Sequence, residues 1–315
     1  MNNSEMYNCQ TANNNILCFA SDAIKSAVEC HIEHEKDTNS VIMFNTGFDE
    51  YYYLHQNNLF EGKKAIYYDL EHKCPIDENG QMSFCSVEWT NNFNKILETY
   101  NEIWDFQLEN YEYFKFHKLD KLFRFKPLRY TTWFKQFYED IVPKYDIQLE
   151  CVVDTQTRMN VFMVLTNEPY RILEDGDVER NNPRISIKMT NTFNAELKLR
   201  EKNDCLYGID FPHYDTPCTI NCFRIYEYIC MNKPVIVWDR DRLSSRNYYG
   251  DLCVWVDDFN TWDLKKITQT QPRKDVAETY KQMTYLDKNY DEYRLNIIRD
   301  YKNKTGISVP DYVMY

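Results

Sequence analysis

Glycine is scarce in this chain of 315 residues, which contains 7 glycines and 10 prolines. No G-x-G-x-x-G stretch and no Walker-type loop occurs, so the usual dinucleotide and P-loop fingerprints are excluded. A phosphate group would therefore be held by a helix N-terminus and by side chains rather than by a glycine-rich loop.

Long apolar runs and cysteine motifs are also missing. No apolar run approaches the roughly 18 residues of a membrane span, so we expect no membrane contact. The polar start, MNNSEMYNCQTANNN, lacks the charged-then-apolar order of a signal peptide. The 11 cysteines form no CxxC pair and mostly sit in apolar segments. We therefore expect reduced, buried thiols in a cytoplasmic protein and no zinc site.

The charge balance is acidic, and aromatic residues are abundant. A net charge of −12 argues against a surface that binds nucleic acid everywhere, although it is compatible with a local basic groove. The 26 tyrosines and 18 phenylalanines, in a chain that is 43% hydrophobic, fit a globular protein long enough for two domains with real cores.

Short apolar runs alternate with stretches of helical spacing along the chain, which indicates βαβ units and a mostly parallel sheet. Strands are expected at residues 15–20, 40–45, 63–71, 102–106, 121–128, 146–153, 184–190, 205–211, 233–239 and 252–258. Helices are expected at residues 21–35, 48–60, 86–100, 108–118, 155–168, 193–204, 216–232 and within 127–145 and 274–304.

The alternation restarts near residues 127–142, which predicts two domains, at residues 1–128 and 129–315. The predicted fold class is α/β, with two Rossmann-like domains facing a central cleft. Ligands of doubly wound sheets bind beyond the carboxyl ends of the strands, so the cleft is the expected site.

One helix-to-strand junction in the second half carries clear boundary signals. Thr216-Pro217 fits an N-cap followed by proline in the first turn. In the stretch RIYEYICMNKPVIVWDRD, Asn232 can close the helix in the left-handed conformation, and Pro234 prevents its continuation. Arg224 and Glu227 are three residues apart, so they share one helix face. The ordinary interpretation of that pair is a salt bridge on a solvated face.

The segment E-Y-I-C-M-N-K-P-V-I resembles the E-A-x-x-x-G-K-P-V-I element of GT-B glycosyltransferases. Asn232 replaces the usual glycine, while the spacing from Glu227 to Lys-Pro matches. The resemblance implies a nucleotide-sugar donor, UDP-linked, bound in the second domain, with an acceptor domain before it. It also implies that Glu227 holds the ribose hydroxyls, because a carboxylate can accept two hydrogen bonds from a vicinal diol. Thr219 stands where retaining members often carry a second glutamate, which leaves the stereochemistry open.

Other residues fit the same resemblance. Arg158 lies where GT-B proteins commonly place a basic residue against the diphosphate, and Arg224 lies on the donor helix. His213 and Tyr214 follow a predicted strand, and the histidine could stabilise leaving-group charge or orient a hydroxyl. The ordinary alternatives are a surface arginine and a loop histidine.

An inverting transfer also needs a base that accepts a proton from the acceptor hydroxyl. The resemblance places this base in the first half, where the candidates are Asp22, Asp49 and Asp69, the last followed by Glu71 and His72. All lie at predicted carboxyl ends of strands. Asp69 and Asp22 are slightly favoured, and the sequence does not choose between them.

Asp239-Arg240-Asp241 resembles the Asp-x-Asp metal site of GT-A enzymes. A three-residue match is weak, and aspartate at a strand end is usually turn chemistry. We therefore expect no obligatory metal.

Residues 115–135 interleave basic and aromatic side chains, as do stretches that line nucleic-acid grooves. The alternative is a solvated rim, because strand alternation sends side chains to opposite faces. The Tyr-, Asn- and Asp-rich composition looks like that of AT-rich phage genes, and the chain resembles phage glycosyltransferases that modify hydroxymethylcytosine in DNA. This resemblance implies a DNA acceptor and location in the host cytoplasm. The alternatives are a glycan acceptor and a non-catalytic binding protein with the same fold.

Overall fold

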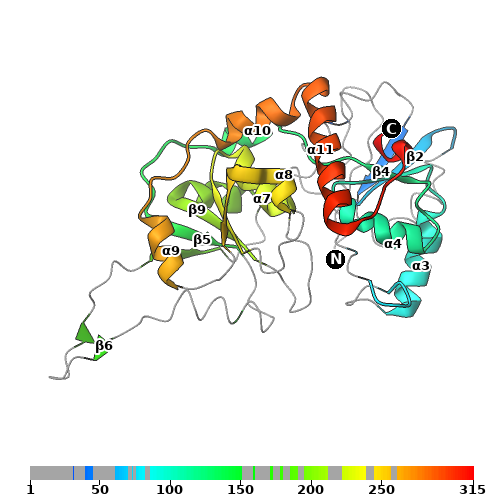
Figure 1. The fold of residues 1–315 in the computed structure, drawn as a ribbon. Coiled ribbons are helices and arrows are strands. Elements are labelled where there is room, and N and C mark those ends of the chain that lie inside the picture. Colours follow the sequence, from blue (N-terminus) through cyan, green and yellow to red (C-terminus); the bar gives the residue numbers. More distant parts are fainter. Residues whose placement is uncertain are drawn as a thin grey trace, which may run out of the picture. The chain divides into compact units, whose positions relative to one another are not determined.

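The fold was analysed in a computed structural model (Figure 1). The structure describes residues 31, 40–44, 61–69, 73, 76–81, 86–150, 159, 171–172, 178–179, 185–190, 195–211, 222–238, 245–256 and 261–315. The chain forms two compact units. Unit 1 comprises Met1–Trp133 and Lys281–Tyr315, and unit 2 comprises Phe134–Tyr280.

Unit 1 contains a four-stranded sheet in the order β1-β2-β3-β4, and all of its pairings are parallel. Its strands are β1 (Ser40–Phe44), β2 (Lys64–Asp69), β3 (Glu102–Asp105) and β4 (Phe123–Phe125). The helices along the same stretch are α3 (Val87–Leu97), η1 (Leu108–Asn110) and α4 (Tyr111–Phe116). Ser86 caps α3, because its side chain accepts a hydrogen bond from the Trp89 amide.

The C-terminal segment belongs to unit 1, whereas the expected boundary assigned it to the second domain. It contains α11 (Asp287–Thr305) and η5 (Asp311–Met314), and α10 (Val276–Thr284) leads into it. The Tyr290 hydroxyl donates to the Pro127 carbonyl over 2.7 Å, and the Tyr130 amide donates to Thr284 Oγ1 over 2.9 Å. These contacts between residues far apart in the sequence explain why periodicity alone could not assign the segment.

Unit 2 contains a five-stranded parallel sheet in the order β11-β10-β9-β5-β8. Its strands are β5 (Tyr145–Leu149), β8 (Ile187–Met189), β9 (Cys205–Asp210), β10 (Val235–Trp238) and β11 (Cys253–Val256). The pair β6 (Arg171–Ile172) and β7 (Val178–Glu179) is a separate antiparallel ladder. The helices are η2 (Trp133–Phe137), which spans the boundary with unit 1, α6 (Ala195–Glu201), η3 (Lys202–Asp204), α7 (Cys222–Cys230), α8 (Ser245–Tyr249), η4 (Gly250–Leu252) and α9 (Thr261–Thr268).

The two faces of the unit 2 sheet differ in chemistry. One face carries the apolar core, in which Ile147, Leu149 and Ile209 are buried together with Leu264 of α9. Alternation sends Gln148 and its neighbours to the other face, which α6 and α7 cover. Around β5 and β9 this second face is polar although it is buried, and it leads to the candidate site, whereas at β10 it carries the buried Val235 and Val237.

The helix-to-strand junction has the predicted geometry. Asn232 has φ 57°, in the left-handed region, and its side-chain oxygen accepts from the Ala277 amide while its amide group donates to the Lys274 carbonyl. Lys233 turns inward, where its ammonium donates to the carbonyls of Asn203 and Cys205 over 3.3 and 3.2 Å. The lysine of the Lys-Pro pair therefore satisfies backbone carbonyls of the turn that leads into β9.

The predicted α/β fold with two Rossmann-like sheets is confirmed, and the strands of the two parallel sheets lie within one residue of a predicted range or inside it. The short pair β6 and β7 was not predicted. The predicted helix within 127–145 is wrong, because only η2 forms there. Asn203 donates to the Phe137 carbonyl over 2.6 Å and accepts from the Glu139 amide over 3.1 Å. These bonds use backbone groups that a continuing helix would need. The expected elements at 15–20, 21–35, 48–60 and 155–168 lie almost wholly outside the described residues.

Candidate functional site

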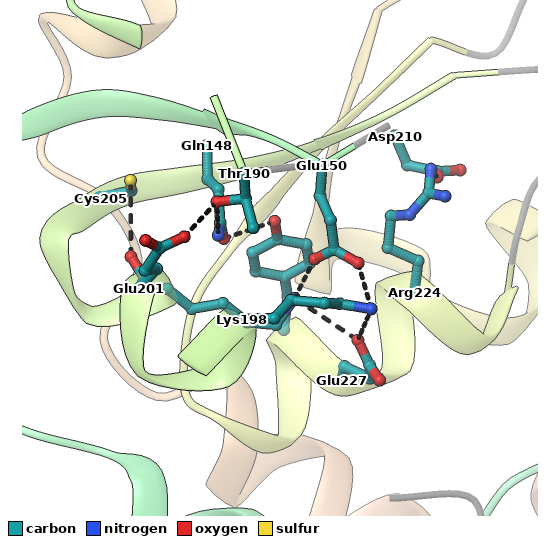
Figure 2. A network of polar contacts seen from close by, with 11 residues as sticks. Gln148, Glu150, Thr190, Lys198, Glu201, Cys205, Asp210, Arg224 and Glu227 are labelled. Carbon is teal, nitrogen blue, oxygen red and sulfur yellow. Dashed lines mark hydrogen bonds and ion pairs between the residues drawn. The ribbon is translucent and has the colours of Figure 1, made fainter. Parts of the chain in front are cut away.

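A buried polar network lies on the second face of the unit 2 sheet, at and below the carboxyl ends of β5 and β9 (Figure 2). Counted along the chain, the five strands have the spatial order 2-1-3-4-5. The order reverses between β5 and β9, and such a reversal is where doubly wound sheets bind ligands. We name this network the switch-point cluster; it comprises Gln148, Glu150, Thr190, Lys198, Glu201, Lys202, Asp210, Arg224, Glu227 and Tyr228.

Two glutamates and two lysines form the charged centre of the cluster. Glu150, directly after β5, binds Lys202 Nζ through Oε2 at 2.6 Å and Lys198 Nζ through Oε1 at 2.5 Å. Glu227 Oε2 lies 3.4 Å from Lys202 Nζ and 3.8 Å from Lys198 Nζ. The formal charges of these four groups cancel, which lowers the cost of burying them.

The electrostatics of the centre follow from burial and from these pairs. Burial alone would raise the pKa of Glu150, but Lys202, Lys198 and then Arg224 outweigh it and lower the pKa to about 2. Burial opposes the charge of Lys198, yet Glu227 and Glu150 raise its pKa. Glu150 is therefore a permanent carboxylate near neutral pH, and Lys198 is a permanent cation.

Glu227 is buried, with 5% of its surface exposed. Its Oε2 atom accepts no hydrogen bond from the residues that the structure describes. Oε2 forms longer ion pairs instead, with Lys202 Nζ at 3.4 Å and Lys198 Nζ at 3.8 Å. The ordinary interpretation, a solvated salt bridge with Arg224, is wrong. Arg224 instead donates to Asp210 Oδ1 at the end of β9 over 3.0 Å.

A second layer of polar and aromatic side chains packs against the charged centre and supports it. The Tyr228 hydroxyl donates to Gln148 Oε1 over 2.7 Å, and Gln148 Nε2 donates to Thr190 Oγ1 over 2.8 Å. Lys202 Nζ sits 3.7 Å from the centre of the Tyr228 ring, a cation–π contact. Gly208 permits this packing, because a Cβ there would meet Tyr228 ring atoms at 2.6 Å. Burial raises the pKa of Tyr228 well above its usual range, so the hydroxyl stays a donor.

Unit 1 has its own buried carboxylates at the carboxyl ends of β2 and β3. Asp69 and Asp105 are register partners, both fully buried, and Asp69 Oδ2 lies 2.9 Å from Lys73 Nζ. Asp105 accepts from the Gln107 amide over 2.7 Å and from Asn110 Nδ2 over 2.8 Å. Burial first, and then the charge of Asp69, raise the pKa of Asp105 well above its usual range.

Several predicted site residues lie outside the described residues: Asp22, Asp49, Arg158, His213, Tyr214 and the turn Asp239-Arg240-Asp241. Of the predicted set, Glu227 and Arg224 come together in the switch-point cluster, and Asp69 lies in unit 1. Glu150, Lys198, Lys202 and Asp210 were missed. The available signal was Glu150 itself, because an acid at the end of an apolar strand needs a buried partner.

Among the described residues, no group of three or more His, Cys, Asp or Glu side chains is close enough to hold a metal ion. Within the same part of the chain, no helix has the length and apolar character needed to span a bilayer.

The basic and aromatic segment at residues 115–135 does not form one surface. Arg124 donates to backbone carbonyls of its own turn, Lys126 is buried over Trp104, and Arg129 pairs with Asp287. Of the aromatic residues, Phe123, Phe125 and Tyr130 are buried in unit 1, and Phe116 is 48% exposed. The predicted nucleic-acid groove is therefore not supported, because several of its basic and aromatic residues serve the core and the C-terminal segment. The exposed basic residues are Lys115, Lys118, Lys121 and Lys135.

Comparisons with known proteins identify no family. No protein-family model and no curated protein matches the chain. Among solved structures, a UDP-N-acetylglucosamine 2-epimerase from Rickettsia bellii is similar over 96% of this chain and 83% of its own, with 12% identity and a TM-score of 0.41. At that level the likeness is distant, and the function proposed below rests on residues of this chain.

Proposed function

We propose that the chain is a glycosyltransferase that binds a nucleotide-sugar donor through Glu227 and moves the sugar to a hydroxyl acceptor. The observation that supports this proposal is the state of the Glu227 carboxylate. It is buried at a topological switch point beside two lysines, and its Oε2 atom accepts no hydrogen bond from the described residues. A vicinal diol supplies the donors that such a carboxylate lacks.

The surroundings of Glu227 favour a polar, anionic ligand class. Lys198 keeps 28% of its side chain exposed at the edge of the cluster, and Arg224 keeps 14% exposed beside Asp210. Permanent cations near a diol-binding carboxylate suit a ribose that carries a diphosphate. The resemblance implies a UDP-linked donor, so UDP is the first donor fragment to test, and GDP is the second.

The acceptor-activating base is proposed among Asp22, Asp49 and Asp69. Asp69 is fully buried and lies 2.9 Å from the Lys73 ammonium, which favours a structural role. A base must come within hydrogen-bond distance of the acceptor hydroxyl, so Asp22 and Asp49 now have the stronger case. Substitution of each aspartate by asparagine would identify the base as the variant that loses transfer while it retains nucleotide binding.

Donor binding is tested by titration of UDP and GDP against the wild type, Glu227→Gln and a matched surface variant, Glu196→Gln. A nucleotide that binds the folded state raises the melting temperature. We expect Glu227→Gln to weaken binding about tenfold, because hydrogen bonds to charged groups contribute about 1.5–3 kcal/mol. Glu196, which is exposed on α6, should have no effect. Equal affinity of Glu227→Gln and wild type would rule out this donor site.

The acceptor is tested separately with a labelled sugar nucleotide. Hydroxymethylated DNA, unmodified DNA and an oligosaccharide mixture are offered in parallel, with and without excess EDTA. The DNA acceptor proposed from the phage resemblance requires label in hydroxymethylated DNA alone, and label confined to oligosaccharides would exclude it. Nucleotide binding without transfer to any acceptor would favour a non-catalytic binding protein. We expect EDTA to leave transfer unchanged.

A further inference from the structure

We propose that Glu150 is a positioning residue for Glu227: it holds Lys198 and Lys202 and thereby keeps Glu227 Oε2 free of a short hydrogen bond to either ammonium, so that a donor hydroxyl can bond to it. This inference rests on the proposed function, because it assigns a role to a neighbour of the proposed donor-binding carboxylate. Glu150 itself is not expected to contact the donor.

The distances within the cluster carry this inference. Both lysines bind Glu150 at hydrogen-bonding distance, 2.5 and 2.6 Å, and each lies farther from Glu227, at 3.8 and 3.4 Å. The two oxygens of Glu150 are each occupied by one ammonium group. Glu227 therefore interacts electrostatically with both lysines, while its Oε2 atom accepts no short hydrogen bond from either of them.

Removal of the Glu150 charge would change that balance. Lys202 is fully buried and stacked on Tyr228, so it cannot move into solvent. Its ammonium would need another anion, and Glu227 is already 3.4 Å away. Lys198 has the same alternative at 3.8 Å. Both ammonium groups would then close on Glu227, and a donor diol would have to displace them.

A merely structural role for Glu150 makes a different prediction. If the carboxylate only stabilised α6 and η3 against β5, its loss would lower stability without specific coupling to Glu227. If it positions Glu227, the effect of Glu150→Gln on nucleotide affinity must depend on Glu227 being present. A double-mutant cycle on binding separates the two cases.

The experiment measures the dissociation constants of UDP and GDP by calorimetry for the wild type, Glu150→Gln, Glu227→Gln and the double variant. We expect a loss of about tenfold for Glu227→Gln and of about three- to tenfold for Glu150→Gln. In the Glu227→Gln background, Glu150→Gln should change affinity by less than about twofold. Glu150→Asp keeps the charge but is one methylene shorter, and it should bind nucleotide between the wild type and Glu150→Gln.

The outcomes distinguish this inference from the proposed function. If neither UDP nor GDP binds the wild type, or if Glu227→Gln binds as well as wild type, the donor site fails and the inference fails with it. If Glu227→Gln weakens binding but Glu150→Gln does not, or if the two losses multiply in the double variant, only the positioning role is overturned. Should Glu150→Gln not fold, the same cycle is run with Glu150→Asp. Glu196→Gln is the control for a charge removed from α6.

Discussion

The two units bury charge at equivalent places, the carboxyl ends of central parallel strands, but they balance it differently. In unit 1, Asp69 and Asp105 share the single ammonium of Lys73, and Asp105 is closed by a backbone amide and by Asn110. In unit 2, the acids of the charged centre are matched by two lysines. Asp69 has its lysine at 2.9 Å, whereas the nearest lysine to Glu227 lies at 3.4 Å. The shorter ion pair suits a structural role, and the longer one suits ligand binding.

The difference also shows in how each site meets solvent. Asp69, Asp105 and Lys73 are all buried to 2% exposure or less. The switch-point cluster keeps one fully buried lysine, Lys202, and one partly exposed lysine, Lys198. The comparison therefore predicts that single substitutions destabilise unit 1 more than unit 2.

The largest expected effect is that of Lys73→Met. It removes the ammonium 2.9 Å from Asp69, next to the buried Asp105, and breaking a buried pair costs about 3–5 kcal/mol of unfolding free energy. Urea denaturation combined with hydrogen exchange at the β2 and β3 amides measures this loss. Lys95→Met, on the exposed face of α3, is the control and should change stability by less than about 0.5 kcal/mol. Adding Asp69→Asn to Lys73→Met should recover part of the loss, and no recovery would contradict the pairing.

A smaller effect is expected for Lys202→Met in unit 2. Glu150 keeps Lys198 at 2.5 Å, so the carboxylate retains a partner and the loss should be about 2 kcal/mol. Lys198→Met removes the more exposed lysine and should cost about 1 kcal/mol. Hydrogen exchange at the β5 and β9 amides provides the measurement. If Lys202→Met cost as much as Lys73→Met, the proposed difference between the two sites would be lost.

The most gradual effect is an opposite response of the two units to pH. Because its pKa is raised in the folded state, Asp105 contributes to the free energy of unfolding below the ordinary aspartate pKa. This contribution is lost as pH rises through the pKa of Asp105 in the folded state. Because its pKa is lowered in the folded state, Glu150 contributes to the free energy of unfolding above the ordinary glutamate pKa of 4.5. This contribution is lost as pH falls toward the folded-state pKa of about 2. Each slope is at most about 1.4 kcal/mol per pH unit.

Hydrogen exchange at β3 and β9, corrected for the intrinsic pH dependence of exchange, reads the two units separately. Asp105→Asn should flatten the response of β3 alone, and Glu150→Gln should flatten that of β9 alone. The same slope in both units, or a slope that neither substitution changes, would show that other groups dominate.

The elements around the switch point were largely predictable from the sequence. The strands β9, β10 and β11 are short apolar runs between polar turns, and their local pattern defines them. The left-handed Asn232 was predictable for the same reason, because a helix followed by Lys-Pro needs a residue that tolerates positive φ. The missing helix within 127–145 was not, because the side chain that replaces its hydrogen bonds, Asn203, lies far along the chain.

The sequence by itself determined that an acid, Glu227, stands on the helix before a buried parallel strand, because helix and strand periods are local properties. Only the tertiary structure decided its partners. The neighbour three residues away, Arg224, turns to Asp210, while Lys198 and Lys202 approach from α6 and η3. The physical reason is that the low dielectric of a buried face makes every charge pair with whatever the packing brings within reach, and sequence spacing does not record that distance.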